Sequence, residues 1–322
     1  MPDGSHHPQT LSAARGIAAD ALAGLSQKQK TLPAKLFYDN EGCRLFGEIT
    51  RLPEYYVTRT ERVVLAQAAM ELAPDMPVGG ALVEYGASDE AKAAILLERI
   101  PQPSAYVPID VAGGALEALT ARMGDSHPGL AVLPLTADFL APLALPPEID
   151  GKPIVGFFPG STIGNLDPAM ARRFLSQVRA TLGAGATFLV GVDLRKDPSV
   201  LVPAYDDAQG VTAAFNRNLL VRLNREAGGD FDLAAFRHRA VWNDRDGRIE
   251  MHLESLRPQT AHVAGVTFSF AAGETIHTEN SYKHTIEGFQ TLAASAGWRP
   301  EHVWADERSM FSLHLLRHGI PS

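Results

Sequence analysis

A short polar loop directly after an apolar segment is the part of this sequence best suited to bind a small molecule. Residues 154–158 (IVGFF) are continuously apolar, which predicts a parallel strand covered on both faces. Residues 160–165 (GSTIGN) follow with two glycines, a Ser-Thr pair and an asparagine, and Asp167-Pro168 then predicts a helix start. Because ligands of open α/β sheets bind beyond the carboxyl ends of the strands, the loop backbone and the Asn165 side chain can contact a small polar molecule. A purely structural left-handed turn position for Asn165 is the alternative.

Two aspartates that follow neighbouring predicted strands indicate a cofactor with a ribose and an adenine. The first strand, residues 81–85, runs into Gly86, and the next strand ends at Asp110, a spacing that suits the hydroxyl pair of a ribose. After the third strand, Asp138 can accept a hydrogen bond from an adenine amino group while Phe139 packs on the ring. Simple turn or capping roles for Asp110 and Asp138 remain open.

The residues after Gly86 argue against a dinucleotide. A dehydrogenase seats its pyrophosphate on a G-x-G-x-x-G turn at a helix N-terminus, and here Gly86 stands without the other glycines. Asp89 and Glu90 open the following helix, where they would repel phosphate. A cofactor with ribose and adenine but no phosphate, such as S-adenosylmethionine (SAM), fits better, and an NAD-linked dehydrogenase is a weaker alternative.

The elements that position these residues alternate between strand and helix patterns. Such alternation predicts βαβ units and a mostly parallel, doubly wound sheet. The predicted strands are 81–85, 105–111, 130–135, 153–158 and 187–194, with helices at 89–100, 114–123 and 167–182 between them.

After residue 194 the pattern changes to a long helix and antiparallel strands, and the helix-strand pattern returns only from residue 284. The predicted elements are a helix at 211–228, a hairpin at 240–254 turning at Asp246-Gly247, strands at 262–270 and 274–282, a helix at 284–297 and two closing strands. We therefore predict a cofactor-binding domain of residues 62–195 plus 284–322. A second, α+β domain would combine residues 1–61 with 196–283.

Composition limits the partners and the compartment. The formal net charge is −8 without a dense Lys/Arg stripe, which argues against nucleic acid. Cys43 is the single cysteine, which excludes a disulfide framework and fits a reducing cytosol. No run of 18 apolar residues occurs, and residues 1–10, His6 and His7 included, lack the form of a signal peptide. We expect a soluble, cytoplasmic monomer with no membrane partner.

Four blocks of the sequence resemble one family. They are residues 38–61 (YDNEGCRLFGEITRLPEYYVTRTE), 160–165 (GSTIGN), 204–216 (AYDDAQGVTAAFN) and 278–283 (TENSYK). These blocks resemble the histidine N-alpha-methyltransferases of ergothioneine biosynthesis, which trimethylate histidine to hercynine. The resemblance, from about Leu32 to Arg317, implies a class I SAM-dependent methyltransferase, a Rossmann-like doubly wound sheet with an inserted α+β substrate-binding domain. A methyltransferase of another amino acid, such as tryptophan, and a SAM-binding regulatory protein without turnover are the alternatives.

The resemblance also implies roles for individual residues. It places Tyr55, Asn165 and Tyr205 around the carboxylate and amino group of histidine, with Tyr38 nearby, so that Tyr38 or Tyr55 would orient or deprotonate the amine. It assigns the imidazole to Glu279 and Ser281, with Met251 lining that pocket. The residues implied for the cofactor are Gly86, Lys92, Asp110, Asp138 and Phe139. Two positions depart from the family pattern: Ser88 replaces a second glycine, and His284 replaces an aromatic residue.

The imidazole assignment has a chemical basis in the sequence. Glu279 and Ser281 lie two apart on a strand-like segment and so point to the same face. A carboxylate accepts a ring N–H, and a hydroxyl can donate to or accept from the other nitrogen. An ordinary polar strand face is the structural alternative. His277 and His284 are not accompanied by a ligand set with metal spacing, so we predict no metal.

Overall fold

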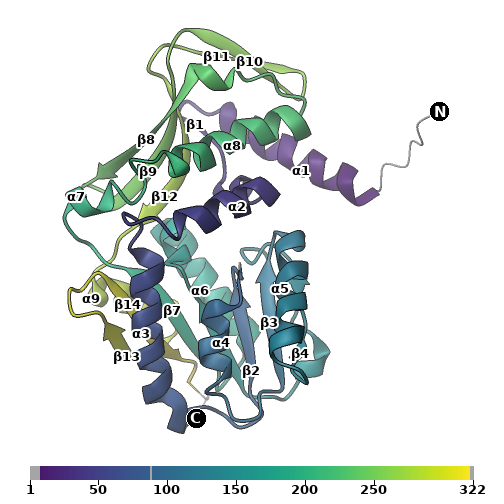
Figure 1. The fold of residues 1–322 in the computed structure, drawn as a ribbon, viewed down its shortest axis with the longest axis vertical. Helices are drawn as coiled ribbons and strands as arrows, with labels where there is room; N and C mark the ends of the chain where they lie inside the picture. The colour runs from purple at the N-terminus through teal and green to yellow at the C-terminus, as the bar shows by residue number, and fades with distance from the viewer. Residues whose placement is uncertain (1–7, 88, 320–322) are drawn as a thin grey trace. The chain divides into compact units, whose positions relative to one another are not determined.

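The computed structural model describes residues 8–87 and 89–319, which form two compact units (Figure 1). The core unit comprises Tyr55–Asp197, Asp244–Arg248 and the chain from Ser281 onward. The insert unit comprises the chain up to Glu54, Pro198–Asn243 and Ile249–Asn280. Within the described ranges, no helix combines the length and the apolar composition needed to cross a bilayer.

An open sheet organises the core unit and confirms the predicted doubly wound architecture. Its strands lie in the order β13-β14-β7-β6-β2-β3-β4, and β5 also pairs with β3. All pairs from β7 to β4 are parallel, whereas β14 is antiparallel to both β7 and β13. The strands are β2 (Ala81–Tyr85), β3 (Ala105–Asp110), β4 (Ala131–Val132), β5 (Leu135–Thr136), β6 (Ile154–Phe158), β7 (Thr187–Asp193), β13 (Arg299–Ala305) and β14 (Phe311–Arg317). The chain order reverses between β2 and β6, which makes their carboxyl ends the expected ligand crevice.

Helices cover both faces of this sheet (Figure 1). One face packs against α3 (Val57–Leu72), α4 (Ala91–Leu97) and α5 (Gly113–Ser126), and the other against α6 (Pro168–Leu182) and α9 (Ile286–Ser295). Side chains alternate along β2, so that Leu82 packs with the helices α3, α4 and α5 on one face, and its neighbour Val83 packs with α6 and α9 on the other. Burial on both faces explains why these strands are continuously apolar in sequence. The predicted start of α6 is confirmed, because Asp167 accepts a hydrogen bond from the Met170 N–H at 2.7 Å.

The insert unit is built around a small sheet with the strand order β1-β12-β9-β8. A separate hairpin pairs β10 with β11. The strands are β1 (Lys30–Thr31), β8 (Phe236–Asn243), β9 (Arg248–Ser255), β10 (Gln259–Val263), β11 (Val266–Phe270) and β12 (Thr275–Tyr282); the helices are α1 (Pro8–Leu25), α2 (Asn40–Ile49), α7 (Pro198–Leu201) and α8 (Val211–Glu226). The hairpin predicted at Asp246-Gly247 is confirmed, since β8 and β9 flank that turn.

One strand prediction is wrong. Residues 262–270 form two strands that pair with each other, with Val263 opposite Val266. Ala264 and Gly265 both have positive φ, 47° and 79°, as a two-residue type I′ turn requires. Alanine rarely takes this conformation, so residues 264 and 265 do not form a strong turn signal in the sequence. Residues 262–270 therefore form a hairpin of their own, and β12 pairs with β9 and β1.

The unit boundaries differ from the predicted residues 62–195 and 284–322 at four points, one of which is the end of the first core segment at Asp197 instead of residue 195. The core unit starts at Tyr55, because α3 buries Val64 and Leu65 against the sheet. It also includes Asp244–Arg248, where the Gly247 carbonyl accepts a hydrogen bond from the Lys283 N–H at 2.9 Å. On the carboxyl side it resumes at Ser281.

Close approach between the 160–165 loop and β12 depends on a glycine. A Cβ added to Gly164 would lie 2.8 Å from the carbonyl oxygen and 3.3 Å from the nitrogen of Tyr282. Backbone atoms cannot move aside as a flexible side chain can. We expect Gly164→Ala to lower the free energy of unfolding by about 1–3 kcal/mol, measured by urea denaturation. Gly124→Ala is the matched control, because Gly124 is exposed on α5 with nothing near its Cβ position, and it should be neutral or stabilising. Equal stability of the two variants would contradict this packing argument.

Candidate functional site

The predicted cofactor residues gather at the carboxyl ends of β2 and β3. Gly86 follows β2 with φ of 75°, and its N–H donates to the Ile109 carbonyl at 2.8 Å. A Cβ at Gly86 would lie 3.7 Å from the ring of Phe139 and 3.9 Å from that of Phe158. Gly86 and Phe139, implied by the resemblance, are therefore neighbours in space. Ser88 lies outside the described residues.

Asp110 and Asp138 both shape the turns that follow their strands. The Asp110 carboxylate accepts from the Ala112 N–H at 2.8 Å, and the Asp138 carboxylate accepts from the Leu140 N–H at 3.0 Å. Burial raises the pKa of Asp110. Both aspartates therefore hold turns, and their ribose and adenine roles stay predictions. The two roles are compatible, since a carboxylate has about four acceptor sites.

A buried ion pair fixes the first residue of the 160–165 loop. Glu61, fully buried on α3, accepts from Lys92 Nζ at 2.7 Å with one carboxylate oxygen and from the Gly160 N–H at 2.7 Å with the other. Lys92 is implied for the cofactor, and the structure gives it this carboxylate partner. The sequence analysis missed Glu61, which looks like an ordinary helical glutamate.

The left-handed backbone of this loop lies at its start. Gly160 and Ser161 have φ of 77° and 56°. Asn165 instead ends a 3-10 turn, η4 (Thr162–Asn165), without positive φ. The structural alternative for Asn165, a left-handed turn position, is therefore wrong. Its side chain is half-buried.

A second buried carboxylate, Asp193 at the end of β7, connects several segments of the core unit. It accepts from the Tyr56 hydroxyl at 2.8 Å, from Lys196 Nζ at 2.6 Å and from Lys283 Nζ at 2.6 Å. Its own N–H donates to Ser161 Oγ at 2.9 Å.

The two ammonium groups determine the charge of Asp193. Burial alone would raise the pKa of this fully buried carboxylate, but Lys283 and Lys196 outweigh it and hold the pKa below its ordinary value. Burial lowers the pKa of Lys196 to about 8. Tyr56 is buried, and its hydroxyl donates a hydrogen bond to the Asp193 carboxylate. Asp193, Lys196 and Lys283 were missed, although Lys283 stands at the end of the TENSYK block.

The residues predicted to bind the amino acid divide between the units. Tyr55, Asn165 and Ser281 belong to the core unit, and Tyr38, Tyr205, Met251 and Glu279 to the insert unit. Tyr55 is buried, and the buried Ser281 accepts from Lys283 Nζ at 2.8 Å through Oγ.

In the insert unit, Tyr38 and Tyr205 each have aromatic or backbone neighbours. Tyr38 makes edge contacts with Phe46 and Phe215, at 6.1 Å between ring centroids in both cases. Tyr205 is 9% exposed, and its carbonyl lies 2.7 Å from His238 Nε2. Both tyrosines are thus held in place, and their roles toward the amine and carboxylate stay predictions.

Met251 lies on the buried face of β9. It alternates with half-buried Glu250 and His252, and its own exposed fraction is 1%. Its carbonyl accepts from the Thr278 hydroxyl on β12 at 3.0 Å. The side chain therefore packs in the core of the insert unit, and its pocket-lining role stays a prediction.

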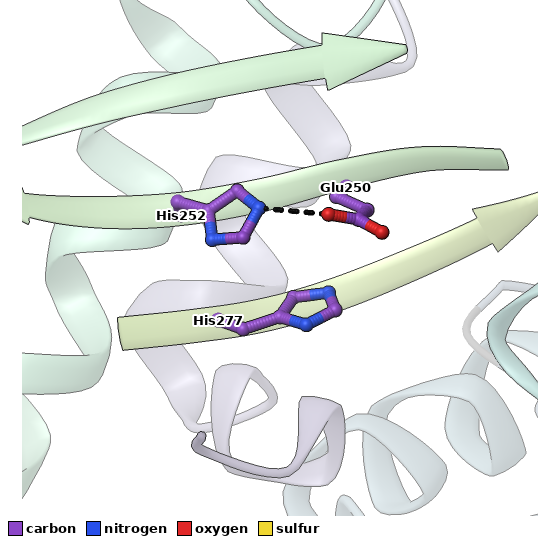
Figure 2. A group of neighbouring side chains, drawn as sticks. All are labelled: Glu250, His252 and His277. Atoms are coloured by element: carbon purple, nitrogen blue, oxygen red, sulfur yellow. Dashed lines mark hydrogen bonds and ion pairs between the residues drawn. The ribbon is translucent and has the colours of Figure 1, made fainter. Parts of the chain in front are cut away.

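Three potential metal ligands come together on the half-buried side of β9 and β12 (Figure 2). The ligand atoms of Glu250, His252 and His277 lie within 4.8 Å of one another. His252 Nε2 is 3.1 Å from Glu250, and the two imidazole rings stack at 4.7 Å. His277 Nε2 lies 3.0 Å from the Glu279 carbonyl and so donates to it. Both Nε2 atoms thus take part in hydrogen bonds within the protein, and the predicted absence of a metal stays a prediction.

The strand order, the glycine turn after β2 and the aspartate at the end of β3 are those of a Rossmann-like class I methyltransferase fold. A profile of the family described as "Histidine-specific methyltransferase, SAM-dependent" matches residues 17–318. The chain belongs to this family.

The curated relatives agree with this assignment. The chain is 43% identical over 311 residues to a histidine N-alpha-methyltransferase of Mycolicibacterium smegmatis, covering 94% of this chain and 95% of the relative. It is 38% identical to the protein of that name from Mycobacterium tuberculosis, covering 93% and 94%. A 4-dimethylallyltryptophan N-methyltransferase of Epichloe festucae is 29% identical, covering 92% and 93%. Among solved structures, the mitomycin 7-O-methyltransferase MmcR has a TM-score of 0.49 at 12% identity, covering 99% of this chain and 74% of that chain.

Glu84, just before the glycine turn, makes the stability of the core unit depend on pH. Burial raises its pKa to about 8, and its carboxyl is paired with the Tyr106 hydroxyl. A raised folded-state pKa means that stability is complete at low pH and is lost as pH rises toward about 8.

We expect Glu84→Gln to remove this dependence, because the amide keeps a similar shape without titrating. The free energy of unfolding of the unmodified protein should fall relative to the variant, by about 1 kcal/mol per pH unit above pH 5. Urea denaturation of both proteins between pH 5 and 8 measures this difference. Parallel stability curves would show that Glu84 ionises without cost.

Proposed function

We propose that this protein transfers three methyl groups from SAM to the α-amino group of L-histidine, giving hercynine as a step of ergothioneine biosynthesis. The observation that carries the proposal is membership of the histidine-specific family over residues 17–318, together with Glu279 and Ser281 on one strand. The substrates are histidine and its mono- and dimethylated forms. The cytoplasmic location and monomeric state expected from the sequence remain predictions.

The cofactor half of the core unit fits SAM. Gly86 leaves room beside the Phe139 ring, and Asp110 presents a carboxylate at the end of β3. SAM supplies a methyl group on a sulfonium, an electrophile that needs no phosphate-binding turn. Asp110 would bind the ribose, Asp138 and Phe139 the adenine, and Gly86 and Lys92 would border the methionine part.

The remaining residues would act on the amino acid. An α-amine has an ordinary pKa of about 7.7–8.0, and desolvation beside a cationic sulfonium lowers it, so the neutral amine is accessible near pH 8. Asn165 and Tyr205 would hold the carboxylate, while Tyr38 or Tyr55 would orient the amine or relay its proton. Holding the reacting atoms about 3–3.5 Å apart supplies much of the rate enhancement. A tyrosine face would also stabilise the methylated ammonium by about 0.5–2 kcal/mol.

Another acceptor amino acid is the second candidate. One relative of this chain is named for a tryptophan derivative, which shows that acceptors differ among the relatives. Glu279 and Ser281 together favour histidine here, because an imidazole has two ring nitrogens for these two side chains, whereas an indole has a single ring nitrogen.

Mass spectrometry after incubation with SAM and an equimolar mixture of the common amino acids tests this function directly. We expect histidine alone to gain three methyl groups, in steps of one, while the other amino acids stay unmodified. Methyl groups on another amino acid would overturn the histidine assignment but keep the methyltransferase reaction. The absence of any methylated product despite SAM binding would overturn both.

Paired substitutions separate substrate binding from cofactor binding. Glu279→Ala should lower kcat/KM for histidine at least about tenfold, because the ring N–H loses its acceptor, while SAM affinity is retained. Asp110→Ala should show the reverse pattern, with weakened SAM affinity in calorimetry. Unchanged histidine kinetics in the first variant, or unchanged SAM affinity in the second, would remove that residue from its assigned site.

A further inference from the structure

A buried histidine of the insert unit, His238, joins the two ends of the 204–216 block. It lies on β8, and its side chain is 1% exposed. Its Nε2 is 2.7 Å from the carbonyl oxygen of Tyr205, and its Nδ1 is 2.8 Å from Nδ2 of Asn216 on α8. Tyr205 stands near the start of the block and Asn216 at its end, and all three residues belong to the insert unit. One of them, Tyr205, is a predicted ligand of the amino acid.

We propose that His238 is a positioning residue: as a neutral imidazole with its proton on Nε2, it fixes the backbone of Tyr205 and with it the tyrosine side chain that binds the amino acid. The inference rests on the proposed function, because it requires Tyr205 to contact the substrate. It adds a residue that acts through Tyr205 and the tautomer that this residue must adopt.

The two partners of the ring determine its tautomer. A carbonyl oxygen only accepts, so Nε2 must carry the proton that is donated to Tyr205. An amide nitrogen only donates, so Nδ1 must be the unprotonated nitrogen that accepts from Asn216. A proton moved from Nε2 to Nδ1 would leave two acceptors, Nε2 and the Tyr205 oxygen, 2.7 Å apart. The opposite tautomer is therefore unfavourable at both nitrogens.

The orientation of the Asn216 amide has independent support. Asn216 is fully buried, and its Nδ2 also donates to the His252 carbonyl at 3.1 Å. The amide thus uses both of its N–H groups, one toward His252 and one toward His238. Its Oδ1 has no hydrogen-bond partner in the part of the chain that the structure describes. Turning the amide over would still be worse, because Oδ1 would then face the His252 carbonyl oxygen, and that carbonyl would lose its donor.

The surroundings of the His238 ring favour the neutral form. Burial lowers its pKa, and Arg217 acts in the same direction, whereas Asp206 and Asp207 act against them. Asp206 is 46% exposed and lies 3.8 Å from Nε2, beyond hydrogen-bond distance. The Asp207 carboxylate accepts from two backbone N–H groups in the first turn of α8. The two carboxylates do not outweigh burial, and the ring is neutral at pH 7.

Tyr205 depends on this contact because it lies in the irregular segment between α7 and α8. Its N–H donates to the Val202 carbonyl at 2.9 Å, within its own turn. Its carbonyl is held from outside the turn, by His238 on β8. Without that second contact, the peptide group after Tyr205 can rotate and carry the tyrosine side chain with it.

NMR of the protein labelled with isotopically enriched histidine tests the tautomer in the absence of substrate. The ring signals of His238 are assigned by their loss in His238→Gln. We expect a protonated Nε2 and an unprotonated Nδ1 at pH 7. A proton on Nδ1, or on both nitrogens, would overturn the proposal. Because no substrate is present, this result does not depend on the proposed function.

Two amide substitutions test whether the donor at Nε2 positions Tyr205. The amide nitrogen of glutamine reaches about as far as Nε2, whereas asparagine is one bond shorter and reaches only as far as Nδ1. His238→Gln should keep the KM for histidine within about twofold, and His238→Asn should raise it at least about fivefold while kcat is retained, as expected for a contact made equally in the ground and transition states. SAM affinity should be unchanged in both. Equal KM values in the two variants, or a joint loss of kcat and SAM affinity in His238→Asn, would overturn the positioning role.

A double-mutant cycle tests whether His238 acts through Tyr205. Tyr205→Phe should raise the KM for histidine, and adding His238→Asn to it should raise the KM further by no more than about twofold. Full multiplication of the two effects would show that His238 acts elsewhere and would overturn the proposal. No effect of Tyr205→Phe would instead remove Tyr205 from the site assigned under the proposed function, and this inference with it.

Discussion

The buried Asp193 carboxylate is the interaction on which the arrangement of the core unit depends. An isolated carboxylate with no exposed surface would be strongly unfavourable, so its position is tenable only with the two ammonium groups and the tyrosine hydroxyl around it. Those partners are Tyr56 directly before α3, Lys196 in the segment after β7, and Lys283 directly after β12. One charge therefore fixes three chain segments at the carboxyl edge of the sheet. Such a pair adds little net stability compared with apolar packing, but removing one partner costs about 3–5 kcal/mol.

Glu61 and Lys92 form a second ion pair with a buried carboxylate, next to the predicted cofactor residues. The Glu61 carboxylate holds the Gly160 N–H, and the Asp193 N–H holds Ser161 Oγ in the next residue. Two buried residues, Glu61 and Asp193, thus fix the left-handed start of the 160–165 loop by hydrogen bonds. A methyl transfer between two bound molecules gains most from fixed positions, and loop ends held by buried carboxylates would contribute to them.

Strand β12 shows how one short element can carry two different hydrogen-bonding groups. Glu279 and Ser281 share a face because side chains alternate along a strand. Their supports differ: the Glu279 carbonyl receives a hydrogen bond from His277, which belongs to the Glu250 cluster, and the Ser281 hydroxyl receives one from Lys283. Under the proposed function, this carboxylate and this hydroxyl, two residues apart, would contact the two nitrogens of the imidazole ring.

Local features of the sequence determined the doubly wound sheet, the helix start at Asp167, the hairpin at Gly247 and the family, because strand alternation, capping and turn residues act over a few positions. They could not determine the hairpin turn at Ala264, where alanine takes a conformation it rarely adopts, nor the conformation of Asn165. Only the tertiary structure decided the partners of Asp193 and Glu61. Tyr56 and Asp193 lie 137 residues apart, and an aspartate in the sequence has the same letter whether it is solvated or buried between two lysines. Burial and long-range pairing determine the charge and hydrogen-bonding direction of such groups, and both arise only when the chain has folded.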